Sequence, residues 1–106
     1  MGFEDEARLE TVTQDGAQAI KYYANQCPVK LVNASVLNGS LLVEVSNDDF
    51  SSDIRRVTQI AAPAAGPSSF DEFRHYVLKN ERVRLTTVGA STVAQLRTTI
   101  PGLALV

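Results

Sequence analysis

The sequence predicts an α+β fold, in which an N-terminal helix packs on an antiparallel, hairpin-based sheet and a C-terminal strand-helix-strand unit completes the chain. Three observations predict it. Apolar residues recur at helical spacing over the first third of the chain. Asn38-Gly39 separates two apolar segments and has the chemistry preferred in two-residue hairpin turns. Segment 82–88 alternates like a strand, and a further segment with helical spacing follows it.

The predicted N-terminal helix stops at Pro28, which cannot continue a helix. Its start is open between a cap at Thr11, a cap at Thr13 and an extension over residues 4–10. Its apolar stripe, with spacings of four, four, three and four, consists of Val12, Gly16, Ile20, Tyr23 and Cys27. On this helix Tyr23 faces the core, and its neighbour Tyr22 is left on the surface.

The predicted hairpin turns at Asn38-Gly39, which fixes how the flanking segments pair. One face of the hairpin is then wholly apolar and consists of Val32, Ala34, Val36, Leu41, Val43 and Val45. The opposite face is mostly polar but carries Leu31 and Leu42. This pattern predicts an antiparallel sheet that is covered on one side.

Residues 53–61 fit two structures. Ile54, Val57 and Ala61 have helical spacing, and a preceding serine could cap such a helix. The β-branched content of the same segment and the turn-forming Asn47-Asp48-Asp49 before it favour a third strand. We favour the strand and keep the helix as the alternative.

A second helix is predicted over residues 70–80. Ser69 and Glu72 form a capping box at its start, and Asn80 suits the left-handed conformation that ends many helices. Its expected buried stripe consists of Phe70, Phe73 and Val77.

The end of the chain is predicted as strand, helix and strand. The strand over residues 82–88 places Val83, Leu85 and Thr87 on one face. A short helix over residues 91–99 and a strand over residues 103–106 follow, which together make a right-handed parallel crossover.

Composition bounds the class of protein. All 106 residues (1–106) are expected to form a single domain with one core. The net charge of −2 and the pI near 5.3 give no overall attraction for nucleic acid or an anionic membrane, so both partners are disfavoured. No apolar run approaches the ~20 residues of a membrane span. The lone Cys27 and an acidic start without an apolar stretch predict a cytoplasmic protein.

The residues that could carry catalysis form no familiar set. His75 is the only histidine, and no nucleophile motif accompanies it. Cys27 falls on the predicted inner stripe, where cysteine behaves as a small apolar residue. Asp48, Asp49 and Asp53 lack the glycine and terminal glutamate of a calcium loop and are expected to form turns and caps. The sequence therefore predicts no catalytic residue, metal or cofactor, and it leans against an enzyme without deciding the question.

The function expected from these observations is that of a small accessory or protein-interaction domain, bacterial or phage-like, that binds a protein partner or itself. The interaction surface is expected to include Tyr22, Leu31, Leu42, Arg55 and Arg56.

The alternative is a small domain that binds an anionic or nucleotide ligand, or an enzyme. The predicted helix N-terminus at Gly89-Ala90-Ser91 would hold the anion through free backbone N–H groups. Arg82 and Arg84 on the preceding strand would add positive charge.

Overall fold

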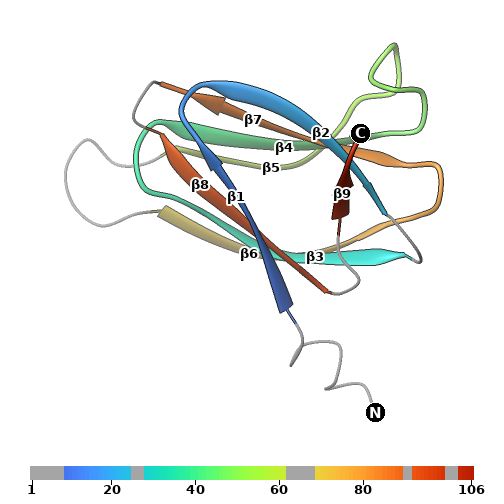
Figure 1. Cartoon of the computed structure of the whole chain (residues 1–106), viewed down its shortest axis with the longest axis horizontal. Helices are drawn as coiled ribbons and strands as arrows, with labels where there is room; N and C mark the ends of the chain where they lie inside the picture. Colours follow the sequence, from blue (N-terminus) through green and yellow to red (C-terminus); the bar gives the residue numbers. More distant parts are fainter. Residues whose placement is uncertain (1–8, 25–27, 62–68, 90–91, 100–102) are drawn as a thin grey trace.

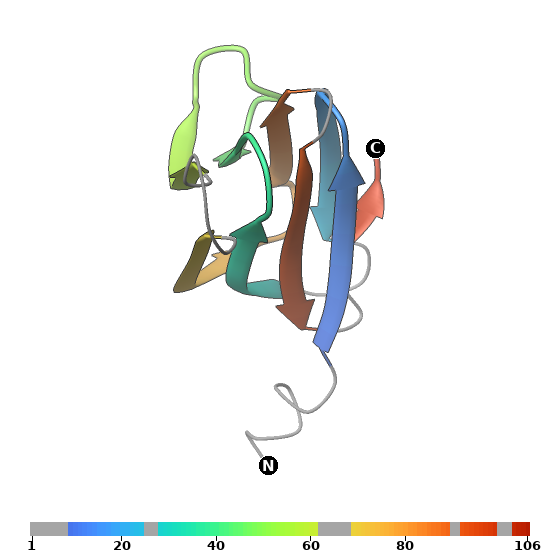
Figure 2. The same ribbon diagram turned by 90° about the vertical axis from the view of Figure 1, so that its left-hand side faces the viewer.

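Two antiparallel β-sheets face each other in the computed structural model of the protein (Figures 1 and 2). The structure describes residues 9–24, 28–61, 69–89, 92–99 and 103–106. These residues form nine strands: β1 (Leu9–Asp15), β2 (Gln18–Ala24), β3 (Val29–Val36), β4 (Ser40–Ser46), β5 (Arg55–Ala61), β6 (Ser69–Val77), β7 (Arg82–Val88), β8 (Val93–Thr99) and β9 (Leu103–Leu105). None of the described residues is helical, so the α+β prediction is wrong and the fold is all-β.

The strand order identifies the architecture as a jelly roll. The first sheet has the order β1-β8-β3-β6, and the second has the order β5-β4-β7-β2-β9. In both sheets, early strands pair antiparallel with late ones: β1 with β8, β2 with β7, β3 with β6 and β4 with β5. The chain is therefore one long hairpin that is rolled so that its pairs alternate between two sheets, which is the jelly-roll arrangement.

The core lies between the two sheets and consists of alternate side chains from the inner strands. On β7, Val83, Leu85 and Thr87 point inward and are buried, as the sequence predicts. From the first sheet, Val36 and Leu96 meet them and are fully buried. This alternation of buried and half-buried residues is expected of strands that are covered on one face.

The predicted N-terminal helix is replaced by strands β1 and β2. The chain turns at Gly16, which has a φ of 77°, a conformation that glycine adopts without strain. In β2 the alternating residues Ile20 and Tyr22 lie opposite Leu85 and Val83 of β7. Tyr22 is therefore buried and Tyr23 exposed, the reverse of the prediction. The alternation of β2 was compatible with a strand throughout, and pairing with a distant strand decided the outcome.

The turn at Asn38-Gly39 is present, but the predicted hairpin is not. Strand β3 pairs with β6 and β8, whereas β4 pairs with β5 and β7, so the two segments lie in different sheets. Five of the six predicted apolar residues do share the core, reaching it from opposite sides: Ala34, Val36, Leu41, Val43 and Val45. A β-bulge at Val32 shifts the alternation of β3 and buries Leu31, which was expected on the polar face.

Both predicted C-terminal helices are also strands. Strand β6 occupies most of residues 70–80 and β8 most of residues 91–99, and both pair with β3. The spacing of Phe70, Phe73 and Val77 fits a helix, but Phe70 is exposed and only Val77 is fully buried. The left-handed conformation expected at Asn80 is confirmed with a φ of 76°, although it lies in the turn between β6 and β7.

The remaining predictions concern single strands. The strand interpretation of residues 53–61 is confirmed by β5, and the terminal strand is confirmed by β9. However, β9 pairs antiparallel with β2, so the predicted parallel crossover is wrong. Within the part of the chain that the structure describes, no helix could cross a membrane.

Candidate interaction surface

Strand β6 carries an exposed aromatic surface at one edge of the first sheet. Among the described strands its only neighbour is β3, so β6 forms one edge of this sheet (Figure 1). Its side chains alternate strictly between the two faces of the sheet. Phe70 is 61% exposed and Tyr76 is 56% exposed, and Leu78 just beyond the strand is 53% exposed.

The outward side of β6 reads Phe70, Glu72, Arg74 and Tyr76, all four exposed. The residues of β3 that lie opposite three of them are polar, namely Ser35 opposite Phe70, Asn33 opposite Glu72 and Lys30 opposite Tyr76. With these polar neighbours, both aromatic side chains remain more than half exposed. Large exposed aromatic residues are enriched at protein interfaces.

The inward side of β6 is tied to the neighbouring sheet. Asp71 accepts a hydrogen bond from the hydroxyl group of Thr58 on β5, and the Ser69 hydroxyl donates to the carbonyl oxygen of Ala61 over 2.8 Å. The Nε2 atom of His75 is buried and has no hydrogen-bond partner in the described structure. These contacts hold the strand in place while its outward residues stay exposed.

A second feature is the loop between β4 and β5, which folds against the second sheet. The Asp48 carboxylate accepts hydrogen bonds from the Ser52 hydroxyl at 2.8 Å and from the backbone N–H groups of Ser51, Ser52 and Asp53. These bonds, with that of the Ser52 hydroxyl foremost, hold the pKa of Asp48 far below its usual range. Asp48 therefore caps this loop, a role that was predicted for Asp48, Asp49 and Asp53.

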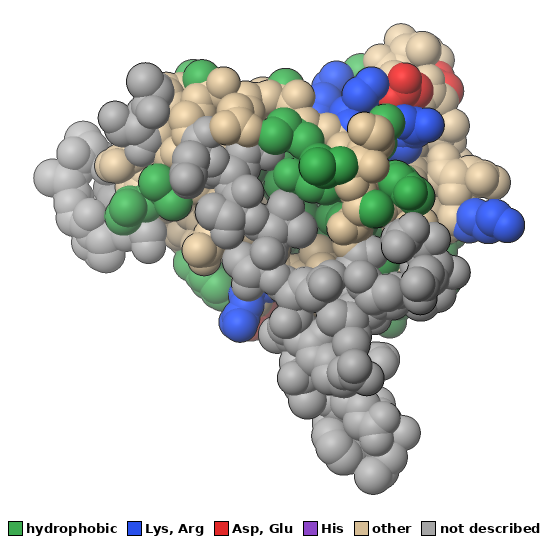
Figure 3. All heavy atoms as spheres, in the orientation of Figure 1, with side chains coloured by type: hydrophobic (Ala, Val, Ile, Leu, Met, Phe, Trp, Pro, Cys, Tyr) green, Lys and Arg blue, Asp and Glu red, His purple; other side chains and the backbone are tan. Residues whose placement is uncertain are grey.

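The same loop covers basic residues of the second sheet. Lys21 forms an ion pair with Asp49 at 2.9 Å, which lowers the pKa of Asp49. The Arg84 guanidinium lies 4.3 Å from the centroid of the Phe50 ring and donates to Glu44 at 2.8 and 3.0 Å. Figure 3 shows basic and acidic side chains side by side at this end of the molecule. Much of the charge on this face is therefore engaged within the protein.

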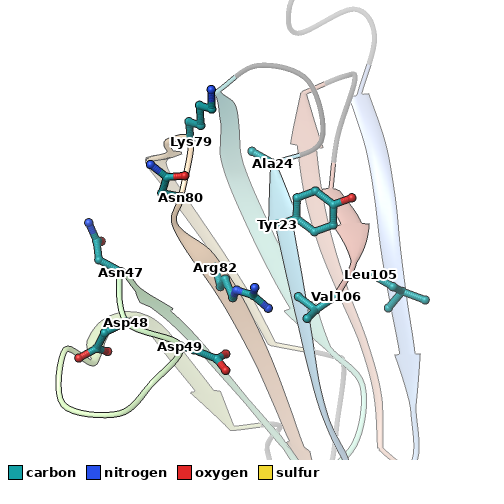
Figure 4. A pocket seen from close by; sticks show the side chains of 10 residues that line it. All are labelled: Tyr23, Ala24, Asn47, Asp48, Asp49, Lys79, Asn80, Arg82, Leu105 and Val106. Carbon is teal, nitrogen blue, oxygen red and sulfur yellow. The ribbon is translucent and has the colours of Figure 1, made fainter.

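A pocket of about 790 Å³ lies beside the loop. Arg82 projects into it between Asp49 and the C-terminal Val106, with Lys79 on its rim (Figure 4). The complete lining is Tyr23, Ala24, Asn47, Asp48, Asp49, Lys79, Asn80, Arg82, Leu105 and Val106. No group of three or more histidine, cysteine, aspartate or glutamate residues that could hold a metal lies among the described residues. The pocket has charges of both signs, and its acidic groups are already hydrogen bonded or ion paired.

The structure separates Arg82 from Gly89, two of the residues expected to bind an anion. Gly89 follows β7 with a φ of 101°, and β8 begins as a strand at Val93, so the helix on which that site depended is absent from the described residues. Arg82 lies at the opposite end of β7 from Gly89, roughly 20 Å away at the rise of a strand. Arg84 lies between them on the outer face. Ala90, Ser91 and Cys27 fall outside the described residues.

The residues expected on an interaction surface are also dispersed. Tyr22 and Leu31 belong to the core, and Leu42 is half-buried on β4. Arg55 and Arg56 are exposed on β5, and Arg55 forms ion pairs with Glu81 at 2.7 Å and with Asp53 at 3.2 Å, which raise its pKa. Sequence analysis missed Phe70 and Tyr76, because apolar residues recur at helical spacing along this segment and do not alternate with polar ones.

Comparison of the sequence with known proteins does not identify a function for this surface. The sequence matches no protein-family model and no curated protein at a significant level. The residues of β6 themselves therefore carry the functional inference.

Proposed function

We propose that this protein is a non-enzymatic interaction module that binds another polypeptide strand along the free edge of β6. The observation that carries the proposal is the exposure of Phe70 and Tyr76 on a single edge strand. An extended segment that adds to a sheet edge gains backbone hydrogen bonds, and its alternate side chains find contacts on one face. The two rings lie on that face.

The fold alone does not select this function. Jelly rolls serve as capsid subunits, lectins and other domains, so function has to be inferred from a site. Two properties of β6 support a strand-binding role. It is nine residues long, and its outward face carries two charged residues between two aromatic ones. Burying one exposed aromatic side chain contributes about 1.5–3 kcal/mol, so two of them can dominate a small interface.

A peptide selection tests the proposal. Nonapeptides selected from a random library for binding to the wild-type protein should slow hydrogen exchange of the β6 amides, because they pair with that edge. Phe70→Ser and Tyr76→Ser should each weaken their binding at least tenfold, because each removes an aromatic contact.

Val88→Ser provides the matched control. Val88 is 60% exposed at the end of β7 in the other sheet, so its replacement should leave peptide binding unchanged. If every selected peptide binds the two β6 variants as tightly as the wild type, or protects amides elsewhere only, the proposed function is wrong.

A further inference from the structure

The order of the central residues of β6 would match acids with bases, and aromatic residues with each other, if a second copy of the strand ran antiparallel to the first. From residue 70 to residue 76 they read Phe-Asp-Glu-Phe-Arg-His-Tyr. Two acidic residues precede Phe73 and two nitrogen-bearing residues follow it, with an aromatic residue at each end. When a second copy of the strand runs in the opposite direction, acids and bases therefore exchange places about Phe73.

In an antiparallel pair of β6 strands centred on Phe73, these complementary residues lie directly opposite each other. Residues directly opposite each other in such a pair lie on the same face with their Cβ atoms about 5 Å apart. The outward face then pairs Glu72 with Arg74 twice and Phe70 with Tyr76 twice. The inward face pairs Asp71 with His75 twice and places the two Phe73 rings opposite each other.

Neighbouring registers lose these matches. Side chains stay on their own face only when the register shifts by an even number of positions. One such shift centres the pair on Glu72 and sets two glutamates opposite each other. The other centres it on Arg74 and sets two arginines opposite each other. Like charges directly opposite destabilise a strand pair, so the register about Phe73 is selected.

We propose that the protein forms a twofold-symmetric dimer in which the two β6 strands pair about Phe73. This inference rests on the proposed function and names its occupant as a second copy of this chain. The two four-stranded sheets then become one continuous sheet of eight strands. The interface uses the same patch on both copies, as closed twofold dimers do.

The inward face gives independent support. The Nε2 atom of His75 is buried without a partner in the described structure, a state that proteins rarely tolerate. Pairing sets the Asp71 carboxylate of the second copy opposite this residue. Thr58 holds the Asp71 side chain from behind through its hydroxyl group, so the carboxylate is already positioned before the strands meet.

Charge exchange at two outward positions tests the dimer. Glu72→Arg places arginine opposite arginine at both symmetric sites, and Arg74→Glu places glutamate opposite glutamate. Each single variant should raise the dimer dissociation constant at least tenfold in sedimentation experiments. The double variant E72R/R74E restores opposite charges and should return to within about threefold of the wild type. A 1:1 mixture of the two single variants should form a mixed dimer for the same reason.

Arg97→Glu is the control, since this exposed arginine lies on the outward side of β8, two strands away from β6. It makes the same change of charge on the same sheet and should leave the dimer intact. A wild type that stays monomeric at millimolar concentration overturns the dimer, and so does a dimer that ignores the single exchanges or is not restored by the double one. A monomer that still binds the selected peptides through Phe70 and Tyr76 rejects self-pairing and leaves the strand-binding function in place.

Discussion

Gly39 shows how a single residue fixes the way two sheets meet. It has a φ of 73°, and a Cβ atom at this position would collide with the Val88 carbonyl oxygen and with the Thr92 hydroxyl. Thr92 in turn donates its hydroxyl hydrogen to the Val88 carbonyl. The sequence predicted the turn from Asn38-Gly39. It could not predict that β7 and the start of β8 approach the turn, because that contact joins distant parts of the chain.

Gly39→Ala is expected to destabilise the fold by roughly 1–3 kcal/mol, because it combines a left-handed backbone with a steric collision. Urea denaturation followed by circular dichroism measures the change. Lys79→Ala, at an exposed turn position, is the control and should change stability by no more than about 0.5 kcal/mol. An unchanged midpoint for the alanine variant at residue 39 would contradict the described packing of this turn.

Asp48 couples the β4–β5 loop to pH. Its pKa is lowered in the folded protein, so its carboxylate stabilises the fold above its unfolded pKa of about 3.9. That stabilisation is lost as the pH falls from this value toward the folded pKa. Asp48→Asn should therefore lower the urea midpoint at pH 7 and have a smaller effect at pH 3. Equal effects at both pH values would show that the charge of Asp48 does not hold the loop.

At the scale of elements, β6 explains why the helix predictions failed. Phe70, Phe73 and Val77 satisfy helical spacing, and polar and apolar residues do not alternate along this segment, so the local sequence favours a helix. In the structure the residues nevertheless alternate between the two faces of the sheet. The choice is made by β3, whose Ala34 lies opposite Asp71 although many residues separate them in the chain. Long-range pairing of this kind overrides helix propensity.

Strand β7 was predictable because its pattern and its neighbours agree, whereas the segment of β5 also fitted a helix. In β7 the alternation of Val83, Leu85 and Thr87 has no competing helical stripe, and all three residues are buried. Strand β3 was predicted as a strand but with the wrong face for Leu31. The bulge at Val32 reverses the alternation there, and nothing in the local sequence marks the bulge.

None of the residues predicted for the interaction surface lies on β6. Arg55 and Arg56 were placed on the surface, and both are exposed on β5, the strand that precedes β6. Phe70 was assigned to a core because a helix would have turned it inward. Once β6 is known as an edge strand, its outward residues and their order about Phe73 can be read from the sequence alone.

At the scale of the whole molecule, the jelly roll depends on contacts between distant segments. Pair β1–β8 joins Leu9 to Thr99, and the pairs β2–β7, β3–β6 and β4–β5 nest inside it. No turn or local motif encodes such nesting, which is why an α+β arrangement fitted the sequence equally well. Among the described strands, each of the two sheets ends in edge strands, and proteins cover, charge or pair such edges. Pairing two copies of β6 removes one open edge from each copy.

One measurement tests the paired edge most directly. In an equimolar mixture of isotope-labelled and unlabelled wild-type protein, filtered nuclear Overhauser spectra detect only contacts between copies. Pairing about Phe73 predicts contacts between backbone protons of residue 72 in one copy and residue 74 in the other, together with contacts from residue 73 to itself. Contacts between copies that avoid β6, or that centre on another residue of the strand, would contradict the account.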